Sequence, residues 1–141
     1  MAEGLLRYYL QQTELRDWVE VNSAGTQASQ PGSRPDQRAQ KVMALRGITI
    51  GRIRARRVTV RDLVRSDFIF AMDESNMRDL WQRSLPEHHD KLSLLLSHHV
   101  GQPLLEVPDP YFGSAEAFER VFQILDDAMD DLVSYIESCL L

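Results

Sequence analysis

The sequence predicts an α/β layered fold in which helices pack against a short parallel sheet. The apolar run at residues 68–72 is flanked by polar residues, as expected for a strand that is buried on both faces. Apolar residues between about 114 and 136 recur at intervals of three and four, which predicts a long amphipathic helix. Short strands that alternate with helices indicate a layered fold with parallel strands.

The composition is typical of one compact domain, and we expect a single domain over residues 1–141. The chain has 141 residues, 43% hydrophobic and 26% charged, which is enough to bury a core without a metal or a disulfide. Its one cysteine excludes a disulfide within the chain, and its net charge of −5 argues against nucleic-acid binding. No membrane-spanning run or secretory signal is found, so we expect a cytoplasmic protein without membrane insertion.

The first half of the chain is predicted to contain two helices and one short strand. Leucine and tyrosine side chains at near-helical spacing indicate a helix over residues 4–12, and apolar residues at 18–21 indicate a strand. Residues 24–34 are rich in Gly, Ser, Gln and Pro, which predicts a loop. Pro35-Asp36 opens the next helix, and Gly47 closes it.

The second half is predicted to alternate helices with apolar strands. Thr59 can cap a short helix that ends near residue 66. Asp73 or Ser75 can cap the helix that follows the strand at 68–72. The remaining elements are a strand, a short extended piece and the closing helix, at residues 92–96, 104–107 and from about 114 to the end.

Polar turns follow three of the predicted extended segments, at residues 23–26, 72–73 and 108–109. In open α/β sheets the functional crevice lies beyond the carboxyl ends of the strands. We therefore expect these three turns to meet at one edge of the sheet and to form the site.

Asp109 is the candidate acid of this site. It lies between two prolines, which restrict φ and remove backbone donors, so its carboxyl group is presented on a stiff loop. An aspartate there could donate a proton to a leaving oxygen and later activate water. The alternative is an ordinary turn aspartate. Tyr111 and Phe112 follow, and they either wall a pocket for an aromatic ring or pack in the core.

Three other groups of residues favour structural interpretations. Six arginines between residues 52 and 65 could attract a phosphorylated substrate, but a solvated face is the simpler interpretation. The histidine pairs at 88–89 and 98–99 have no carboxylate or cysteine at metal-ligand spacing, so no metal site is expected. Cys139 follows an acidic helix face, which disfavours a reactive thiolate.

In the order and spacing of six motifs, the chain resembles the low-molecular-weight protein-tyrosine-phosphatase family. The resemblance extends from Met1 to about residue 136. Met1-Ala2-Glu3 is similar to the opening of that family's first helix. The other motifs that carry the resemblance are Ser23-Ala24-Gly25-Thr26, Pro35-Asp36-Gln37-Arg38-Ala39, Ala55-Arg56-Arg57-Val58, Met72-Asp73-Glu74-Ser75-Asn76 and Asp109-Pro110-Tyr111.

The resemblance implies a three-layer sandwich around a short parallel sheet, of the phosphotyrosine phosphatase I type. It also implies phosphotyrosine hydrolysis through a phosphocysteine intermediate, without a cofactor. Asp109 would be the general acid and base, Tyr111 and Phe112 would bind the substrate, and Ser23 would support the phosphate loop. The implied partner is a phosphotyrosine protein, such as a bacterial tyrosine kinase, although some members prefer phosphoarginine.

The chain departs from the family at its N-terminal end and in its pocket. The family's Cys-x5-Arg phosphate loop and first central strand have no counterpart before Met1, so we expect an N-terminally incomplete domain that is inactive as it stands. Ile53 replaces a histidine that steadies the loop in many members, and Ser29 and Gln30 replace a pocket aromatic. One cysteine also excludes a thiol-based arsenate reductase.

Two alternatives to a catalytic protein follow from these departures. The first is a pseudophosphatase, a non-catalytic relative that acts as a protein-binding module. The second is a phosphate-sensing module that uses the N-terminus of the first helix and the arginine cluster.

Overall fold

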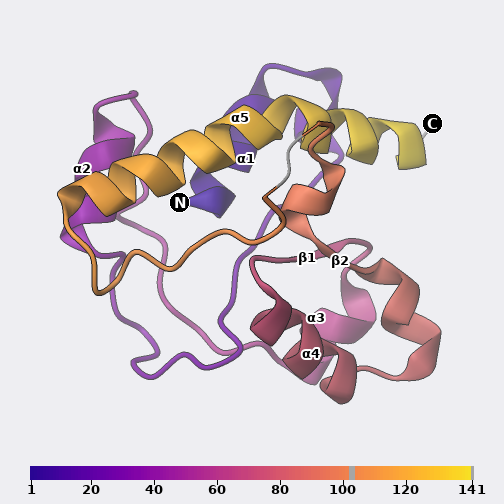
Figure 1. Cartoon of the computed structure of the whole chain (residues 1–141). Coiled ribbons are helices and arrows are strands. Elements are labelled where there is room, and N and C mark those ends of the chain that lie inside the picture. Colours follow the sequence, from indigo (N-terminus) through magenta and orange to yellow (C-terminus); the bar gives the residue numbers. More distant parts are fainter. Residues whose placement is uncertain (102–103, 141) are drawn as a thin grey trace.

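A computed structural model describes residues 1–101 and 104–140 of the chain, shown in Figure 1. The N-terminal half contains helices and loops before the sheet begins. The elements of this half are α1 (Ala2–Gln11), the 3-10 helix η1 (Glu14–Asp17), α2 (Gln37–Ala44) and α3 (Val60–Arg65). The remaining elements are β1 (Ile69–Ala71), α4 (Glu74–Arg83), η2 (Pro86–Lys91), β2 (Leu92–Leu94), η3 (Leu95–His98) and α5 (Ala115–Leu140).

The sheet is short and parallel, as predicted. β1 pairs with β2 in the register Ile69↔Leu92, Phe70↔Ser93, Ala71↔Leu94. Successive side chains of a strand point to opposite faces of the sheet. Accordingly, Ala71 and Leu92 belong to one core, whereas Phe70 packs against the other.

Two hydrophobic cores on opposite faces of the sheet produce the layered architecture. The larger core joins α1, α2, η3 and α5, with Leu132 and Met129 of α5 fully buried. The smaller core lies between the sheet and α3 and α4, and it contains Leu63 and Leu80. Figure 1 shows α1 and α5 on one side of β1 and β2, with α3 and α4 on the other. The predicted three-layer α/β fold is confirmed.

Local capping signals in the sequence determine where three helices begin. Asp36 accepts a hydrogen bond from the backbone N–H of Arg38 at the start of α2. Thr59 forms a capping box with Asp62 at the start of α3, and Asp73 caps α4 through the N–H of Asn76. These side chains satisfy backbone donors that have no partner inside the helix. The predicted starts of these helices are confirmed.

The predicted strand at residues 18–21 is wrong. Trp18 is 83% exposed and ends η1, and the following residues are extended without a ladder. The carbonyl oxygen of Val21 instead accepts a hydrogen bond from Nε of Arg7, at 3.2 Å. A strand needs a neighbour that satisfies its backbone groups, and no described strand lies beside this segment.

Two further segments are shorter or less regular than predicted. The strand expected at 92–96 ends at Leu94, and η3 continues from Leu95. The segment at 104–107 lies outside the two strands, and the backbone N–H of Val107 donates to the carbonyl of Met72 at 2.8 Å. Among the helices that the structure describes, none is long and apolar enough to span a membrane.

Candidate active site

Hydrogen bonds bring the three predicted turns together beyond the carboxyl end of β1. The bond between Val107 and Met72 places the acid-bearing segment beside the end of the strand. The backbone N–H of Glu74 donates to Oε2 of Glu106 at 2.8 Å, which ties the same segment to the start of α4. On the other side, Nδ2 of Asn76 donates to Oγ1 of Thr26 at 3.1 Å. These bonds link residues in or next to the three turns near the end of β1, in line with the expectation from the sequence.

Asp109 is exposed in the segment between η3 and α5. Its Oδ1 accepts a hydrogen bond from the backbone N–H of Tyr111, at 3.0 Å. This Asx-turn bond orients the carboxylate while leaving it at the surface. The turn role and an acid role are compatible, because a carboxylate has further acceptor positions.

Arg38 links the Asp109 loop to α2, a contact that the sequence analysis missed. Its Nη1 donates to the carbonyl of Gly113 at 2.6 Å, and its Nη2 donates to the carbonyl of Tyr111 at 2.9 Å. The guanidinium also lies 4.4 Å from the ring centroid of Phe118. Arg38 therefore holds the backbone on the C-terminal side of Asp109. Its position in the Pro-Asp-x-Arg motif was the only sequence signal.

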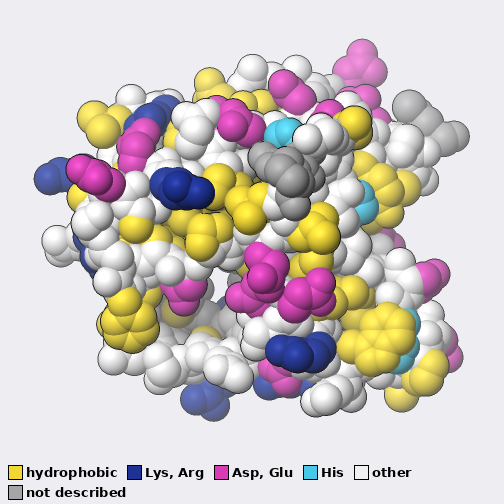
Figure 2. Space-filling model, viewed as in Figure 1, with side chains coloured by type: hydrophobic (Ala, Val, Ile, Leu, Met, Phe, Trp, Pro, Cys, Tyr) yellow, Lys and Arg dark blue, Asp and Glu magenta, His cyan; other side chains and the backbone are white. Residues whose placement is uncertain are grey.

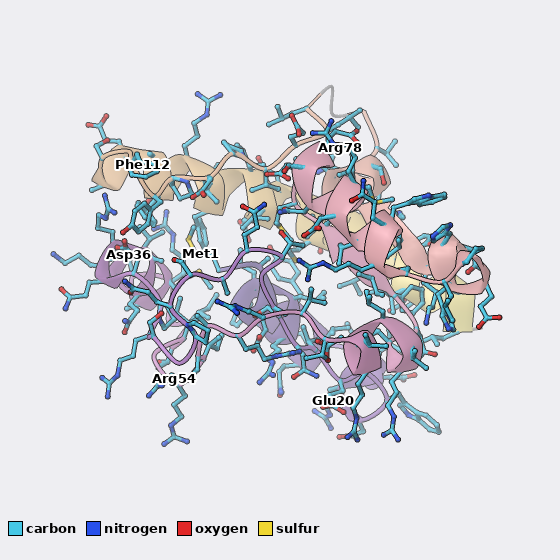
Figure 3. The ribbon with its side chains drawn as sticks, turned by 90° about the horizontal axis from the view of Figure 1, so that it is seen from below. Met1, Glu20, Asp36, Arg54, Arg78 and Phe112 are labelled. Carbon is cyan, nitrogen blue, oxygen red and sulfur yellow. The ribbon has the colours of Figure 1, made fainter. Side chains whose placement is uncertain are left out.

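Asp36 in turn holds the guanidinium of Arg38. Nη2 of Arg38 lies 2.9 Å from Oδ2 of Asp36, and Nε donates to Oδ1 at 3.0 Å. These bonds from Arg38 lower the pKa of Asp36 below its ordinary value, so the pair stays ionised. Figure 3 shows Asp36 and Phe112 at the same end of the molecule.

Tyr111 and Phe112 project from the loop beside Asp109. Their rings meet edge to face, with centroids 4.9 Å apart, and 61% of Tyr111 and 97% of Phe112 is exposed. Core packing is therefore not their role in this structure. Two exposed aromatic rings beside a carboxylate can stack on the ring of a ligand.

Ser23 contacts the start of α1. Its Oγ donates to Oε1 of Glu3 at 2.6 Å, and Glu3 is only 9% exposed. Oε2 of Glu3 lies 3.1 Å from Nη2 of Arg7. Glu3 is thus a buried acid with two partners, and it places Ser23 beside the first turn of α1.

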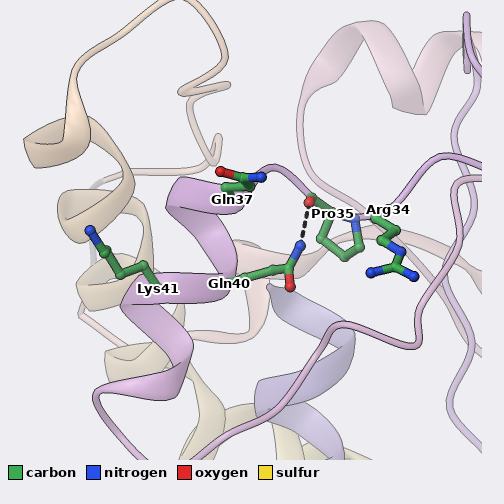
Figure 4. Close-up of a pocket in the computed structure, with 5 residues that line it drawn as sticks. All are labelled: Arg34, Pro35, Gln37, Gln40 and Lys41. Carbon is green, nitrogen blue, oxygen red and sulfur yellow. Dashed lines mark hydrogen bonds between the residues drawn. The ribbon is translucent and has the colours of Figure 1, made fainter.

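Two shallow hollows lie near these residues, and Asp109 lines neither. One, of about 270 Å³, is lined by Glu3, Ser23 and several arginines. The other, of about 390 Å³, lies at the start of α2 between Arg34 and Lys41 (Figure 4). In this second hollow Nε2 of Gln40 donates to the carbonyl of Pro35, at 2.8 Å.

The histidines and the cysteine belong to other elements than the Asp109 loop. His89 stacks on Trp81 at 3.7 Å between centroids, and His98 stacks on Tyr135 at 3.9 Å. The two histidine pairs occupy η2 and the end of η3 rather than a strand. Cys139 is exposed near the end of α5.

Comparison with known proteins agrees with the fold. The family described as low molecular weight phosphotyrosine protein phosphatase matches residues 1–139. A protein of that name from Gallus gallus is 36% identical over 124 residues, which cover 87% of this chain and 78% of the relative. The chain therefore belongs to the low molecular weight phosphotyrosine protein phosphatase family.

Solved structures give the same result. A protein tyrosine phosphatase from Entamoeba histolytica, solved with Hepes in its active site, is similar with a TM-score of 0.92 and 33% identity, over 99% of this chain and 89% of that one. YfkJ from Bacillus subtilis is similar with a TM-score of 0.90 and 28% identity, over 97% of this chain and 85% of that one. The fold is that of this family of protein phosphatases.

Proposed function

We propose that residues 1–141 form one domain, the acid-bearing part of a protein-tyrosine-phosphatase that hydrolyses phosphotyrosine in protein substrates. The observation that carries the proposal is the Asp109 loop, held at the carboxyl end of β1 by Val107 and against α2 by Arg38. Family membership supports the substrate class, and a tyrosine kinase is one candidate substrate. Action in the cytoplasm is part of the proposal.

In this mechanism Asp109 transfers protons in both chemical steps. A cysteine thiolate attacks phosphorus, the bond from phosphorus to the tyrosine oxygen breaks, and Asp109 gives its proton to the leaving phenolate. Asp109 then takes a proton from the water that hydrolyses the phosphocysteine. Tyr111 and Phe112 flank the phenyl ring, and Ser23 supports the phosphate loop beside the start of α1.

Cys139 is not the thiolate of this scheme. It lies 24 positions after Ala115 on one continuous helix, which is about 36 Å at 1.5 Å per residue. The Asp109 loop precedes the opposite end of that helix. We therefore expect the 141 residues on their own to have no thiol-dependent phosphatase activity.

Aryl phosphate hydrolysis tests this proposal. The 141-residue chain should be inactive, and the same chain joined to a Cys-x5-Arg loop and its strand from a relative should be active. Asp109→Asn in the joined protein should lower kcat by about a hundredfold, the scale of general acid catalysis. Glu116→Gln, an exposed acid at the start of α5, is the control and should leave kcat unchanged.

Two results would contradict the proposal. One is turnover by the 141-residue chain that disappears in Asp109→Asn. The other is a joined protein that folds and binds phosphate but retains full activity without Asp109.

The second candidate is a pseudophosphatase that binds a phosphotyrosine protein without turnover. Two observations favour it. Tyr111 and Phe112 are exposed and can contact a partner. The one cysteine of the 141 residues, Cys139, is remote from both rings. Binding of a phosphotyrosine peptide to the 141-residue chain, lost in Tyr111→Ala, would favour this candidate. Equal binding of the unphosphorylated peptide would exclude it.

A further inference from the structure

Positive charge is concentrated in one segment of this acidic chain. Residues 34–65 contain ten of the 16 lysines and arginines but only two of the 21 acids. Both acids are ion-paired within the segment, Asp36 with Arg38 at 2.9 Å and Asp62 with Arg56 at 2.7 Å. The segment is therefore strongly cationic, while the rest of the chain is strongly anionic.

Four arginines of this segment are exposed, and we call them the arginine edge: Arg34, Arg52, Arg54 and Arg57. Arg52 and Arg54 line the hollow of about 270 Å³ together with Arg7 and Arg56. Figure 3 places Arg54 at the border of the molecule, on the loop between α2 and α3. Figure 2, viewed as in Figure 1, shows several acidic side chains along the upper edge of the molecule, where α5 lies.

Backbone hydrogen bonds hold the arginine edge in place. Ala55 N donates to Ser33 O at 2.9 Å, and Gly32 N donates to Ala55 O. Arg34 follows Ser33 and Arg54 precedes Ala55, so each of these two arginines is next in the chain to a residue of this bonded pair. Gly25 forms a parallel bridge with Arg57, which secures the other end of the edge. A surface that is already ordered loses less entropy when a partner binds.

The charges of the arginine edge are not neutralised within the described part of the chain. There, no carboxylate lies within 4.0 Å of Arg34, Arg52, Arg54 or Arg57. Arg54 donates only to carbonyls of its own loop, and Arg57 donates to the carbonyl of Ala28. Each guanidinium has five N–H groups, so several donors face solvent.

The one acid in the hollow does not cancel this charge. Glu3 is buried and pairs with Arg7 and Ser23. Asp62 pairs with Arg56, and that guanidinium lowers the pKa of Asp62 below its ordinary value. Arg52 and Arg54 therefore remain as cations without a carboxylate beside them.

We propose that the arginine edge binds an acidic segment of a partner protein, rich in Asp and Glu and extended in conformation. Side chains two residues apart on an extended segment point to one side, about 7 Å apart. Arg52 and Arg54 line one hollow, so two acidic side chains on the same side of such a segment can face them. A long nucleic acid fits less well, because its phosphates would meet the anionic remainder of the chain. The proposal concerns binding alone and goes beyond phosphate hydrolysis.

Fluorescence anisotropy of a labelled peptide of alternating Glu and Ser residues tests this inference on the 141-residue chain. Two variants change the net charge equally: Arg52→Glu with Arg54→Glu in the edge, and Arg78→Glu with Arg120→Glu on α4 and α5. Arg78 and Arg120 are exposed, which makes them a matched control. Arg52→Gln with Arg54→Gln is a neutral version of the edge variant, in case charge reversal disturbs folding.

The wild-type chain should bind the peptide, and binding should weaken as salt rises, because salt screens exposed charges. The edge variant should bind about tenfold more weakly, because two exposed ion pairs are replaced by repulsion. The affinity of the neutral edge variant should lie between those of the wild-type chain and the charge-reversed edge variant. The affinity of the control variant should stay within about twofold of wild type.

Three results would each overturn the inference. The first is no salt-sensitive binding by the wild-type chain. The second is an equal loss in the edge and control variants, which would indicate a general effect of net charge. The third is tighter binding of a single-stranded oligonucleotide of equal charge, which would indicate a nucleic-acid surface. None of these results depends on turnover. Failure of the arginine edge to bind an acidic segment would therefore leave the proposed phosphatase function untouched, and failure of the proposed phosphatase function would leave the binding proposal untouched.

Discussion

At the scale of single residues, Arg38 connects the fold to the proposed chemistry. A general acid must be held within reach of the leaving oxygen, and a loop on the surface is not rigid by itself. Arg38 supplies two hydrogen bonds to the backbone after Asp109 and is itself held by Asp36. The sequence predicts the acid from its flanking prolines, but the tether joins residues more than 70 positions apart.

Removing the Arg38 guanidinium should loosen the Asp109 loop. In Arg38→Met the carbonyls of Tyr111 and Gly113 lose their donors, so the loop should open more often. Amide hydrogen exchange at Tyr111 and Gly113 should become about tenfold faster, as expected for easier local opening.

Lys41→Met on the same helix is the control, because Lys41 is exposed and faces the second hollow. It should leave exchange in the loop unchanged. Equal acceleration in both variants would show that α2, rather than Arg38, determines the order of the loop.

At the scale of elements, the sheet side of α5 carries an aromatic cluster around His98. His98 stacks on Tyr135 and lies edge to face with Phe70, at 5.3 Å between centroids. Its Nε2 lies 2.8 Å from Oγ of Ser93 in β2. This cluster joins β1, β2, η3 and α5, so its stability reflects how firmly α5 is attached to the sheet.

The cluster should make the stability of the protein sensitive to pH. Burial lowers the pKa of His98 below its ordinary value of 6.5, so the folded protein keeps the ring neutral. Below pH 6.5 the unfolded chain binds a proton at His98 that the folded chain does not bind. The free energy of unfolding should therefore decrease as the pH is lowered from 6.5, until the pH passes the pKa of His98 in the folded protein.

Melting temperatures between pH 5 and pH 8 measure this effect. His98→Gln should reduce the loss of stability on acidification. An unchanged pH profile in His98→Gln would show that His98 does not contribute to the acid sensitivity.

The elements also show where local sequence signals suffice. The starts of α2, α3 and α4 follow from side chains that cap the adjacent backbone, and α5 follows from its apolar periodicity. The strands were predicted less well. The end of β2 at Leu94 depends on the neighbouring β1, which stops at Ala71, and no property of Leu95 reveals that limit.

At the scale of the whole molecule, the two cores share one thin sheet. The larger core lies between the sheet and α5, and the smaller core lies between the sheet and α4. Each strand contributes side chains to both faces, so neither core can lose its order without exposing the sheet. We therefore expect the two cores to unfold together.

A pair of core truncations tests this coupling. Leu132 is 0% exposed in the larger core and Leu80 is 5% exposed in the smaller one. Leu132→Ala and Leu80→Ala should each cost about 2–5 kcal/mol, because each leaves a cavity. Both should shift one cooperative transition, followed by far-UV circular dichroism and by tyrosine fluorescence.

Val64→Ala on α3 is the control, because Val64 is 48% exposed and should matter little. Two separate transitions, with Leu80→Ala affecting only one of them, would contradict the coupling of the cores.

The sequence by itself determined the features that depend on neighbouring residues. These are the α/β class, the capped starts of α2, α3 and α4, the amphipathic α5, the buried β1 and the presentation of Asp109 between prolines. Each follows from covalent geometry, capping or periodicity within about one or two turns of the chain.

Only the tertiary structure decided features that need a partner distant in sequence. Residues 18–21 lack a strand partner, and Arg38 reaches the loop after Asp109. The loop that carries Arg52, Arg54 and Arg57 is held where Ala55 bonds to Ser33 and where Arg57 pairs with Gly25. A ladder, a tether or a charged surface requires two segments, and neither segment specifies the other locally. The loop conformation around Asp109, the proposed acid, therefore depends on local sequence, whereas the position of that loop depends on packing.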